Sequence, residues 1–322
     1  MRQFAKPTIV VSKCLEFDAC RYNGEMIPDV IIRNLQPFVT FIPVCPEVEI
    51  GLGTPRETIR IVEENGENRL VQPSTREDVT EKMEQFSNDF LQTIPDVDGF
   101  ILKNRSPSCG TRDVKIYSGF EKAPAKGKGA GLFGGAVVKN FSHLPIEEEG
   151  RLSNFIIREH FFTRLFTIAY YKMIKHNKNM KELVSFQSDN KYLFMAYNQV
   201  KQKELGRIIA NQKNEKIEVV FENYEKTLYE LFMRAPRYTS NVNVCEHIFG
   251  YFKTKLKKQE KDHFIELLQK YAEKKIPLSS LLTILKSWAI RFDEKYLLRQ
   301  TYFEPYPEAL VEISDSGKGR DY

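Results

Sequence analysis

The hydrophobic pattern of the chain changes once, close to residues 144–151. Before that point, short apolar runs alternate with helical patterns, which is typical of an α/β layer with a mostly parallel sheet. From about residue 152, apolar residues recur at helical spacing and strand signals are few. The sequence therefore predicts two domains, a Rossmann-like α/β domain over residues 1–145 and an all-α domain over residues 151–322.

Charge is divided unevenly between these two parts. Residues 1–150 contain 18 Lys and Arg against 22 Asp and Glu, whereas residues 151–322 contain 30 against 21. An acidic front half joined to a basic back half predicts separate roles, with a polyanion as a candidate partner of the second. No apolar run reaches the roughly 18 residues of a membrane span, and the first residues hold no signal-peptide core, so we expect a cytoplasmic protein with no membrane partner.

Three cysteines lie in turn-like segments just beyond strand-like runs. Cys14 and Cys45 each follow within three residues of such a run, and Cys109 lies in a Ser-Pro-Ser-Cys-Gly segment beyond a third. Ligands of open α/β sheets collect beyond the carboxyl ends of the strands. We therefore expect the three thiols to meet at one edge of the predicted sheet.

This set of thiols suits a metal site that the protein completes only in part. Five cysteines are too few for a disulfide scaffold in a chain of 322 residues. A structural zinc site requires a fourth Cys or His, and all five histidines lie in or beside the helical half. Cys45 precedes a proline, as iron–sulfur ligands often do. The pattern favours an iron–sulfur cluster with one open position, and structural cysteines are the alternative. Cys20 and Cys245 are interpreted as non-ligands.

Polar side chains near the cysteines are candidates for catalysis. Glu47 lies two residues beyond Cys45. Its carboxylate either favours the start of a helix or accepts a proton from water beside the metal. Ser106 and Ser108 flank a proline, and their hydroxyls either cap a turn or hold a substrate. The sequence does not distinguish Ser106 from Ser108 as the hydroxyl that would hold a substrate.

Several motifs of the first 140 residues occur together and in a characteristic order. They are Val11-Ser12-Lys13-Cys14, Arg21-Tyr22-Asn23-Gly24, Pro43-Val44-Cys45-Pro46-Glu47, Thr54-Pro55-Arg56, Asp78-Val79-Thr80, Ser106-Pro107-Ser108-Cys109-Gly110 and Ile116-Tyr117. This set resembles the thiouracil desulfurase family. The resemblance implies a [4Fe–4S] cluster held by Cys14, Cys45 and Cys109, whose fourth iron binds the sulfur of a thiolated pyrimidine. It also implies that Glu47 activates water and that Ser106 assists.

The second half carries its own motifs. They include Leu183-Val184-Ser185-Phe186-Gln187-Ser188, Asn241-Val242-Asn243-Val244, His247-Ile248-Phe249-Gly250-Tyr251-Phe252-Lys253 and Phe303-Glu304-Pro305-Tyr306-Pro307. They resemble the helical domain that is often fused behind the desulfurase domain, and the fusion is similar to bacterial tRNA 4-thiouridine desulfidases. The resemblance implies that the helical domain presents tRNA to the cluster, in agreement with its basic charge.

Three functions are consistent with the sequence. The first is desulfuration of 4-thiouridine in tRNA, which the two fused domains and the charge division favour. The second is desulfuration of free thiouracil, with the helical domain merely covering the pocket. The third is a non-enzymatic, metal-binding RNA adaptor with structural cysteines. Basic and aromatic residues are interleaved in residues 234–238 and 247–258, which makes these segments candidates to contact phosphates and stack a base. The alternative is that Lys253, Lys255, Lys257 and Lys258 form only a solvated helix face.

Overall fold

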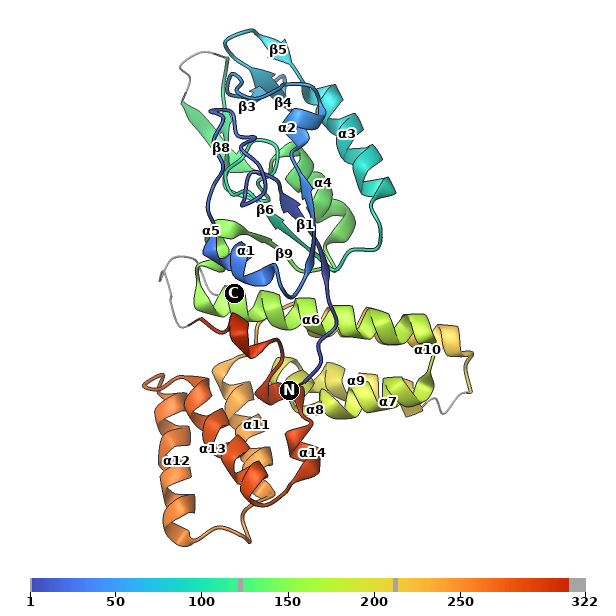
Figure 1. Cartoon of the computed structure of the whole chain (residues 1–322), viewed down its shortest axis with the longest axis vertical. Coiled ribbons are helices and arrows are strands. Elements are labelled where there is room, and N and C mark those ends of the chain that lie inside the picture. The colour runs from blue at the N-terminus through green and yellow to red at the C-terminus, as the bar shows by residue number, and fades with distance from the viewer. Residues whose placement is uncertain (1, 121–123, 211–213, 313–322) are drawn as a thin grey trace. The chain divides into compact units, whose positions relative to one another are not determined.

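The computed structural model describes residues 2–120, 124–210 and 214–312 (Figure 1). The chain divides into two compact units, Met1–Ala169 with a segment that begins at Ala309, and Tyr170–Glu308. The predicted fold class is confirmed: the first unit is an α/β unit with a parallel sheet, and the described residues of the second unit are helical.

The two compact units do not have the same bounds as the predicted domains. The units meet inside the long helix α6 (Phe155–Asn177), which begins in one and ends in the other. The predicted boundary region, residues 144–151, contains a strand and most of a short helix. The domain bounds 1–145 and 151–322 stay a prediction, since they describe sequence modules and the units describe packing.

Four parallel strands form the central sheet of the first unit, in the order β2-β1-β6-β9. Their bounds are β1 (Thr8–Ser12), β2 (Thr40–Val44), β6 (Gly99–Leu102) and β9 (Ile146–Glu148). Every residue of β6 is buried, as expected for a strand covered on both faces. The register pairs Ser12 with Val44, so β1 and β2 end at the same edge of the sheet.

A second sheet of mixed direction has the strand order β5-β4-β3-β7-β8. Its strands are β3 (Arg60–Glu64), β4 (Glu67–Gln72), β5 (Glu77–Asp78), β7 (Val114–Tyr117) and β8 (Ala125–Gly129). The hairpin of β3 and β4 turns through Asn65 and Gly66, whose φ angles of 52° and 85° suit a two-residue hairpin turn. Strand β8, Ala-Lys-Gly-Lys-Gly, has no apolar alternation that would reveal it in the sequence.

Short helices complete the first unit. They are α1 (Val30–Leu35), α2 (Pro46–Glu49), α3 (Thr80–Thr93), α4 (Leu132–Phe141) and α5 (Glu149–Leu152). Helix α1 begins after Asp29, whose carboxylate accepts the N–H groups of Ile31 and Ile32 at 2.9 and 3.0 Å. Helices α3 and α4 pack through aromatic rings, with the centroids of Phe90 and Phe133 5.8 Å apart.

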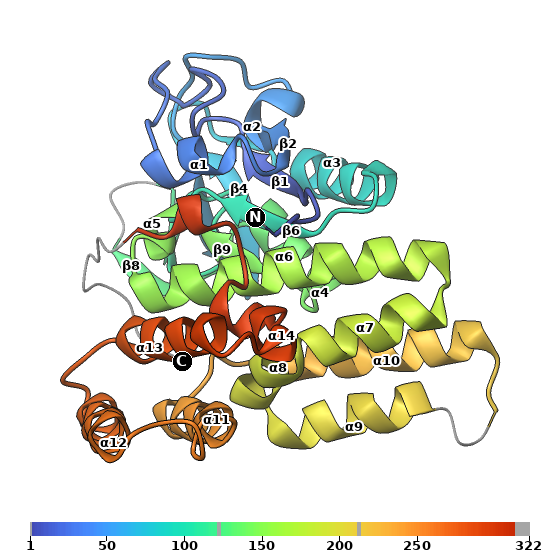
Figure 2. The same cartoon turned by 60° about the horizontal axis from the view of Figure 1, so that its bottom comes forward.

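The second unit is built from helices that Figure 2 shows in a turned view. Beyond α6 they are α7 (Met180–Asp189), α8 (Lys191–Tyr197), α9 (Gln199–Ala210), α10 (Ile217–Leu231), α11 (Tyr238–Gly250), α12 (Lys258–Ala272), α13 (Leu278–Arg291) and α14 (Lys295–Leu298), with a short 3₁₀ turn at Thr301–Phe303. A second 3₁₀ turn, Glu308–Leu310, begins at the last residue of this unit and continues into the first. Buried rings fill its core, among them Tyr171, Phe186 and Trp288. None of the helices in the described part of the chain has the length and apolar composition that crossing a bilayer requires.

The N-terminus of α4 holds the loop that follows β6. The N–H groups of Gly131 and Gly134 donate to the carbonyl oxygens of Gly110 at 2.7 Å and Ser108 at 2.9 Å. Such close approach excludes side chains: a Cβ on Gly134 would lie 2.3 Å from the carbonyl oxygen of Gly110. The glycine-rich stretch before and within α4 therefore serves as a packing surface for this loop.

Gly134→Ala should destabilise the protein, whereas Gly135→Ala should not. A Cβ at position 135 meets only a methyl group at 3.4 Å, while the one at position 134 meets backbone oxygens. We expect Gly134→Ala to cost about 1–3 kcal/mol through overpacking, and Gly135→Ala to be neutral or to gain up to about 1 kcal/mol of helix propensity. Thermal unfolding of the two variants beside the wild type measures this difference, and equal midpoints would contradict the packing argument.

Candidate active site

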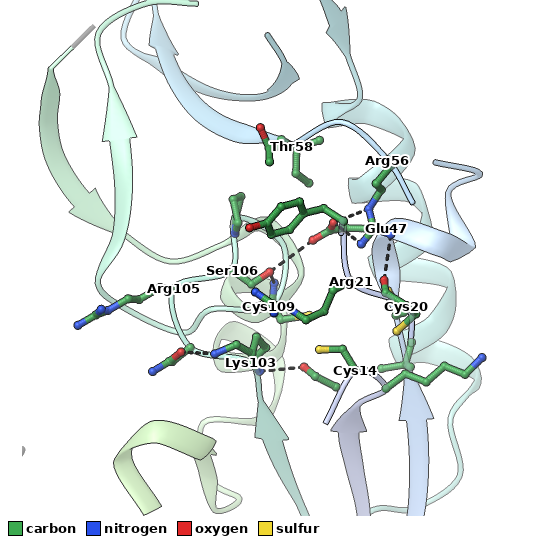
Figure 3. A pocket seen from close by; sticks show the side chains of 18 residues that line it. Cys14, Cys20, Arg21, Glu47, Arg56, Thr58, Lys103, Arg105, Ser106 and Cys109 are labelled. Carbon is green, nitrogen blue, oxygen red and sulfur yellow. Dashed lines mark hydrogen bonds and ion pairs between the residues drawn. The ribbon is translucent and has the colours of Figure 1, made fainter. Parts of the chain in front are cut away.

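The three predicted cysteines line one cavity of about 350 Å³ (Figure 3). Cys14 lies two residues beyond β1, Cys45 directly follows β2, and Cys109 lies in the loop after β6. Because β1 pairs in parallel with both β2 and β6, the chain leaves all three strands at the same edge of the sheet. The structure brings the three thiols to one cavity, and their role as ligands stays a prediction.

Glu47 lines the same cavity and is held by an ion pair. Its side chain is 13% exposed and that of Arg56 is 4% exposed. Nη2 and Nε of Arg56 donate to Oε2 of Glu47 at 2.6 and 2.8 Å, and Oγ of Ser108 donates to Oε1 at 2.6 Å. Charge-assisted hydrogen bonds on both oxygens fix the orientation of the carboxylate.

The two candidate serines occupy different places. Ser106 lines the cavity, whereas Ser108 is fully buried. Oγ of Ser106 accepts the N–H of Cys109 at 3.1 Å and that of Ser108 at 3.3 Å, and it lies 3.5 Å from Oε1 of Glu47. Ser106 is thus the hydroxyl that reaches the cavity, and Ser108 makes the shorter contact with Glu47 from behind it.

Other residues also line the cavity, among them Cys20 and Arg56, to which the sequence assigned no role in the site. Cys20 is buried, and the Cys45 thiol points to its carbonyl oxygen at 3.8 Å. Arg56 was noted only as the end of a Thr-Pro-Arg motif, and that motif was the signal that could have drawn attention to it. The non-ligand interpretation of Cys20 stays a prediction. Cys245 belongs to the buried core of the second unit.

The acidic run near the predicted domain boundary is buried and supports the loop that carries Cys109. Glu148 accepts the N–H of Thr111 at 2.7 Å and its hydroxyl at 3.0 Å. Glu149 accepts the N–H of Asn104 at 2.7 Å and pairs with the ammonium group of Lys103. The sequence marks these carboxylates only by their place at the predicted domain boundary, yet they satisfy donors that the loop would otherwise bury without partners.

Several cavity thiols are held in the neutral form by their surroundings. Burial raises the pKa of the Cys109 thiol to about 12. A hydrogen bond to Cys14 raises the pKa of the Cys20 thiol to about 11, and a hydrogen bond to Cys20 together with burial raises the pKa of Cys45. A bound metal reverses this preference, because its positive charge stabilises thiolates.

The donor set fits a cluster of metal ions. Within the described ranges, no three Cys, His, Asp or Glu side chains are grouped closely enough to share one metal ion. A four-iron cluster spreads its thiolates over separate irons, so its ligands need not converge on one point. Thiols of Cys14, Cys45 and Cys109 on three separate loops around one cavity match this requirement.

In protein prepared without iron, Cys109 should resist alkylation. A thiol with a pKa near 12 has a thiolate fraction of about 10⁻⁴ at pH 8, roughly a thousandfold below that of an ordinary cysteine. Its alkylation rate should rise about tenfold per pH unit between pH 8 and pH 10. Iodoacetamide labelling followed by peptide mass spectrometry measures each cysteine separately, with urea-unfolded protein as the control. Equal labelling of Cys109 in folded and unfolded protein would contradict this expectation.

Each half of the chain matches a known protein family. Residues 9–149 match the model of the 2-thiouracil desulfurase family, and residues 191–307 match a family described as a protein of unknown function, DUF1722. The uncharacterized protein YbbK of Bacillus subtilis is 36% identical over 118 residues, which cover 34% of this chain and 77% of that protein. The uncharacterized protein YbgA of Escherichia coli is 22% identical over 156 residues, covering 48% of this chain and 92% of that protein.

Among solved structures, the [4Fe–4S]-dependent thiouracil desulfidase TudS shares 26% identity over 46% of this chain and 93% of that chain, with a TM-score of 0.36. A TM-score this low carries no argument about function. The family assignment instead follows from the sequence model and from the Bacillus subtilis relative. Through residues 9–149, the chain belongs to the 2-thiouracil desulfurase family, and it joins this domain to a DUF1722 domain.

Proposed function

We propose that the chain removes sulfur from a thiolated pyrimidine by a hydrolytic, non-redox reaction, with 4-thiouridine in tRNA as the favoured substrate. One observation carries the proposal: the three predicted ligand cysteines, together with Cys20 and an ion-paired glutamate, line a single cavity in a domain of the 2-thiouracil desulfurase family. The coarser part of the proposal, a desulfurase acting on a thiouracil-like ring, rests on the family. The RNA substrate rests on the second half of the chain.

Cys14, Cys45 and Cys109 would hold a [4Fe–4S] cluster and leave one iron without a protein ligand. When bound, the cluster supplies Lewis acidity toward the sulfur of the substrate. With three thiol ligands and no fourth ligand from the protein, one iron of the proposed cluster is open to the substrate. If Cys20, which lines the same cavity, were also a ligand, the cluster would be closed to the substrate.

Glu47 is positioned to take a proton from water in the cavity. The water oxygen then bonds to the ring carbon that carries sulfur, and the carbon–sulfur bond breaks with its electron pair on sulfur. The two protons of the water finish on the sulfide, so C=S and H₂O become C=O and H₂S without a change of oxidation state. Ser106, on the cavity wall 3.5 Å from Glu47, is placed to hold the same water or a polar atom of the ring.

The basic half of the chain supports RNA as the carrier of the base. Residues 151–322 contain nine more basic than acidic residues. At the start of α11, Arg237 is exposed and suits a phosphate contact. The neighbouring Tyr238 is 37% exposed, and its ring is contacted by Tyr271 and by the ammonium group of Lys274. Lys255, in contrast, pairs with Glu294 at 3.5 Å, as a solvated face would. Extracting a stacked base costs a few kcal/mol, which phosphate contacts would offset.

An anaerobic assay tests the proposal. Protein reconstituted with iron and sulfide should convert 4-thiouridine in tRNA to uridine and release sulfide in equal amount, and Cys45→Ala should abolish both cluster absorbance and turnover. Turnover of free 4-thiouracil alone would reject tRNA as the substrate. Absence of iron–sulfur absorbance, with no effect of Cys45→Ala, would instead favour the RNA adaptor.

Glu47→Gln should keep the cluster and lose most of the activity. The amide is nearly the same shape but cannot accept a proton, and general-base catalysis is worth roughly 10²–10⁴-fold in rate. Iron and sulfide content should stay within error of the wild type while kcat falls by at least about a hundredfold. Single-turnover desulfuration measures the chemical step, and an unchanged rate would refute the base role.

Binding of tRNA should weaken steeply with salt. If the second half neutralises several phosphates, the logarithm of the affinity falls linearly with the logarithm of the salt concentration, with a slope of about one per contact. Arg237→Ala should reduce that slope by about one, whereas Arg291→Ala, which removes an arginine already paired with Glu260 at 2.8 Å, should not. Fluorescence titrations between about 50 and 200 mM salt measure the slope for each variant. A salt-independent affinity would reject phosphate contacts.

A further inference from the structure

We propose that Arg56 and Ser108 are positioning residues that clamp the Glu47 carboxylate from two sides and leave it one acceptor direction toward the cavity. The inference deepens the proposed function and rests on it, since it concerns the water that Glu47 deprotonates. The sequence motifs that contain Arg56 and Ser108 do not predict this role.

Arg56 fixes one carboxylate oxygen. Its Nη2 and Nε both donate to Oε2 of Glu47, at 2.6 and 2.8 Å. Its Nη1 donates to the backbone carbonyl oxygens of Cys20 at 2.9 Å and Gly53 at 2.8 Å. All three nitrogens are therefore engaged, and the guanidinium plane is set by backbone atoms. The arginine cannot follow the carboxylate if the carboxylate rotates.

Ser108 fixes the other oxygen. It is fully buried, and its hydroxyl donates to Oε1 of Glu47 at 2.6 Å. A hydroxyl has only one proton, so the Ser108 oxygen is left to accept from Ser106, whose Oγ lies 2.9 Å away. The Ser106 oxygen already accepts two N–H groups, which leaves its own proton for donation. The hydrogen-bond direction thus runs from Ser106 through Ser108 to Glu47.

Counting acceptor positions locates the water. A carboxylate offers about four lone-pair directions. Arg56 takes two on Oε2 and Ser108 takes one on Oε1, so the fourth direction, on Oε1, meets only the long contact from the Ser106 hydroxyl, which a water in the cavity can replace. This direction lies on the side of Ser106, which is 3.5 Å from Oε1 and lines the cavity. A water held there is aimed by both neighbours, and its position changes if either side of the clamp is removed.

Arg56→Lys and Ser108→Ala test the clamp. Lysine keeps the charge but presents one point instead of a planar fork, so Oε2 loses its fixed partner. We expect kcat to fall about 10- to 100-fold for Arg56→Lys and about 10-fold for Ser108→Ala, with KM within about twofold, because misplacing a reacting group costs rate more than binding. Matched controls are Arg69→Lys, from a 2.7 Å pair with Asp78 outside the cavity, and Ser87→Ala, from a buried serine bonded to Met83.

Two readouts separate positioning from a structural role. In a Glu47→Gln background, Arg56→Lys and Ser108→Ala should add less than a twofold further loss, since the group they position is gone. In protein prepared without iron, the infrared carboxylate band that Glu47→Gln removes should shift in both variants and not in the two controls. Arg56→Ala should also regain part of its kcat when guanidinium ion is added.

Several outcomes would overturn the clamp. They are full activity of Arg56→Lys and Ser108→Ala, losses that multiply with that of Glu47→Gln, or an unshifted carboxylate band. Ser108→Ala, which removes a single oxygen atom, carries the test alone should Arg56→Lys not fold by circular dichroism. A wild-type protein that desulfurates no thiolated pyrimidine would instead reject the proposed function, and the infrared result would still stand on its own.

Discussion

The parallel pairing of β1 with β2 and β6 determines where the functional side chains of the first unit lie. The carboxyl ends of parallel strands lie at the same edge of the sheet, and the register pairs Ser12 with Val44. Cys14 lies two residues after the end of β1, and Cys45 directly follows β2. Nothing local brings them together, because they are separated by a turn and helix α1. A one-residue slip of β1 would reverse which side chains face the core and move Cys14 relative to Cys45.

The Cys109 loop depends on a second set of contacts, because no strand pairing reaches it. Its carbonyl oxygens accept from the N-terminus of α4, and its N–H groups donate to Glu148 and Glu149. Both sets come from parts of the chain that follow the loop, from α4 and from the segment where β9 ends and α5 begins. Backbone donors and acceptors that would be costly to bury alone are thereby paired, and the loop is held without regular structure.

Sequence pattern predicted the parts of this unit that are local or periodic. The strand that ends before Cys45 and the helical repeat from residue 152 are periodic, so the fold class was accessible, and turn-like surroundings singled out the cysteines. The partners of Glu47 were not accessible. Arg56 reaches it across nine positions and Ser108 across sixty-one, and no periodicity links them. The structural role of the buried acids Glu148 and Glu149 was not accessible either, because sequence does not show which donors a carboxylate will meet.

The Glu47–Arg56 pair is costly for stability. A charged pair this buried loses hydration that its attraction only partly returns, and apolar residues of the same size often stabilise a protein as well or better. What the pair and Ser108 provide is a single orientation of the carboxylate beside the thiols. The same contacts also join the segments that carry Cys45 and Cys109. A fixed orientation of this kind is what a base acting on a water in the cavity requires, as we propose for Glu47.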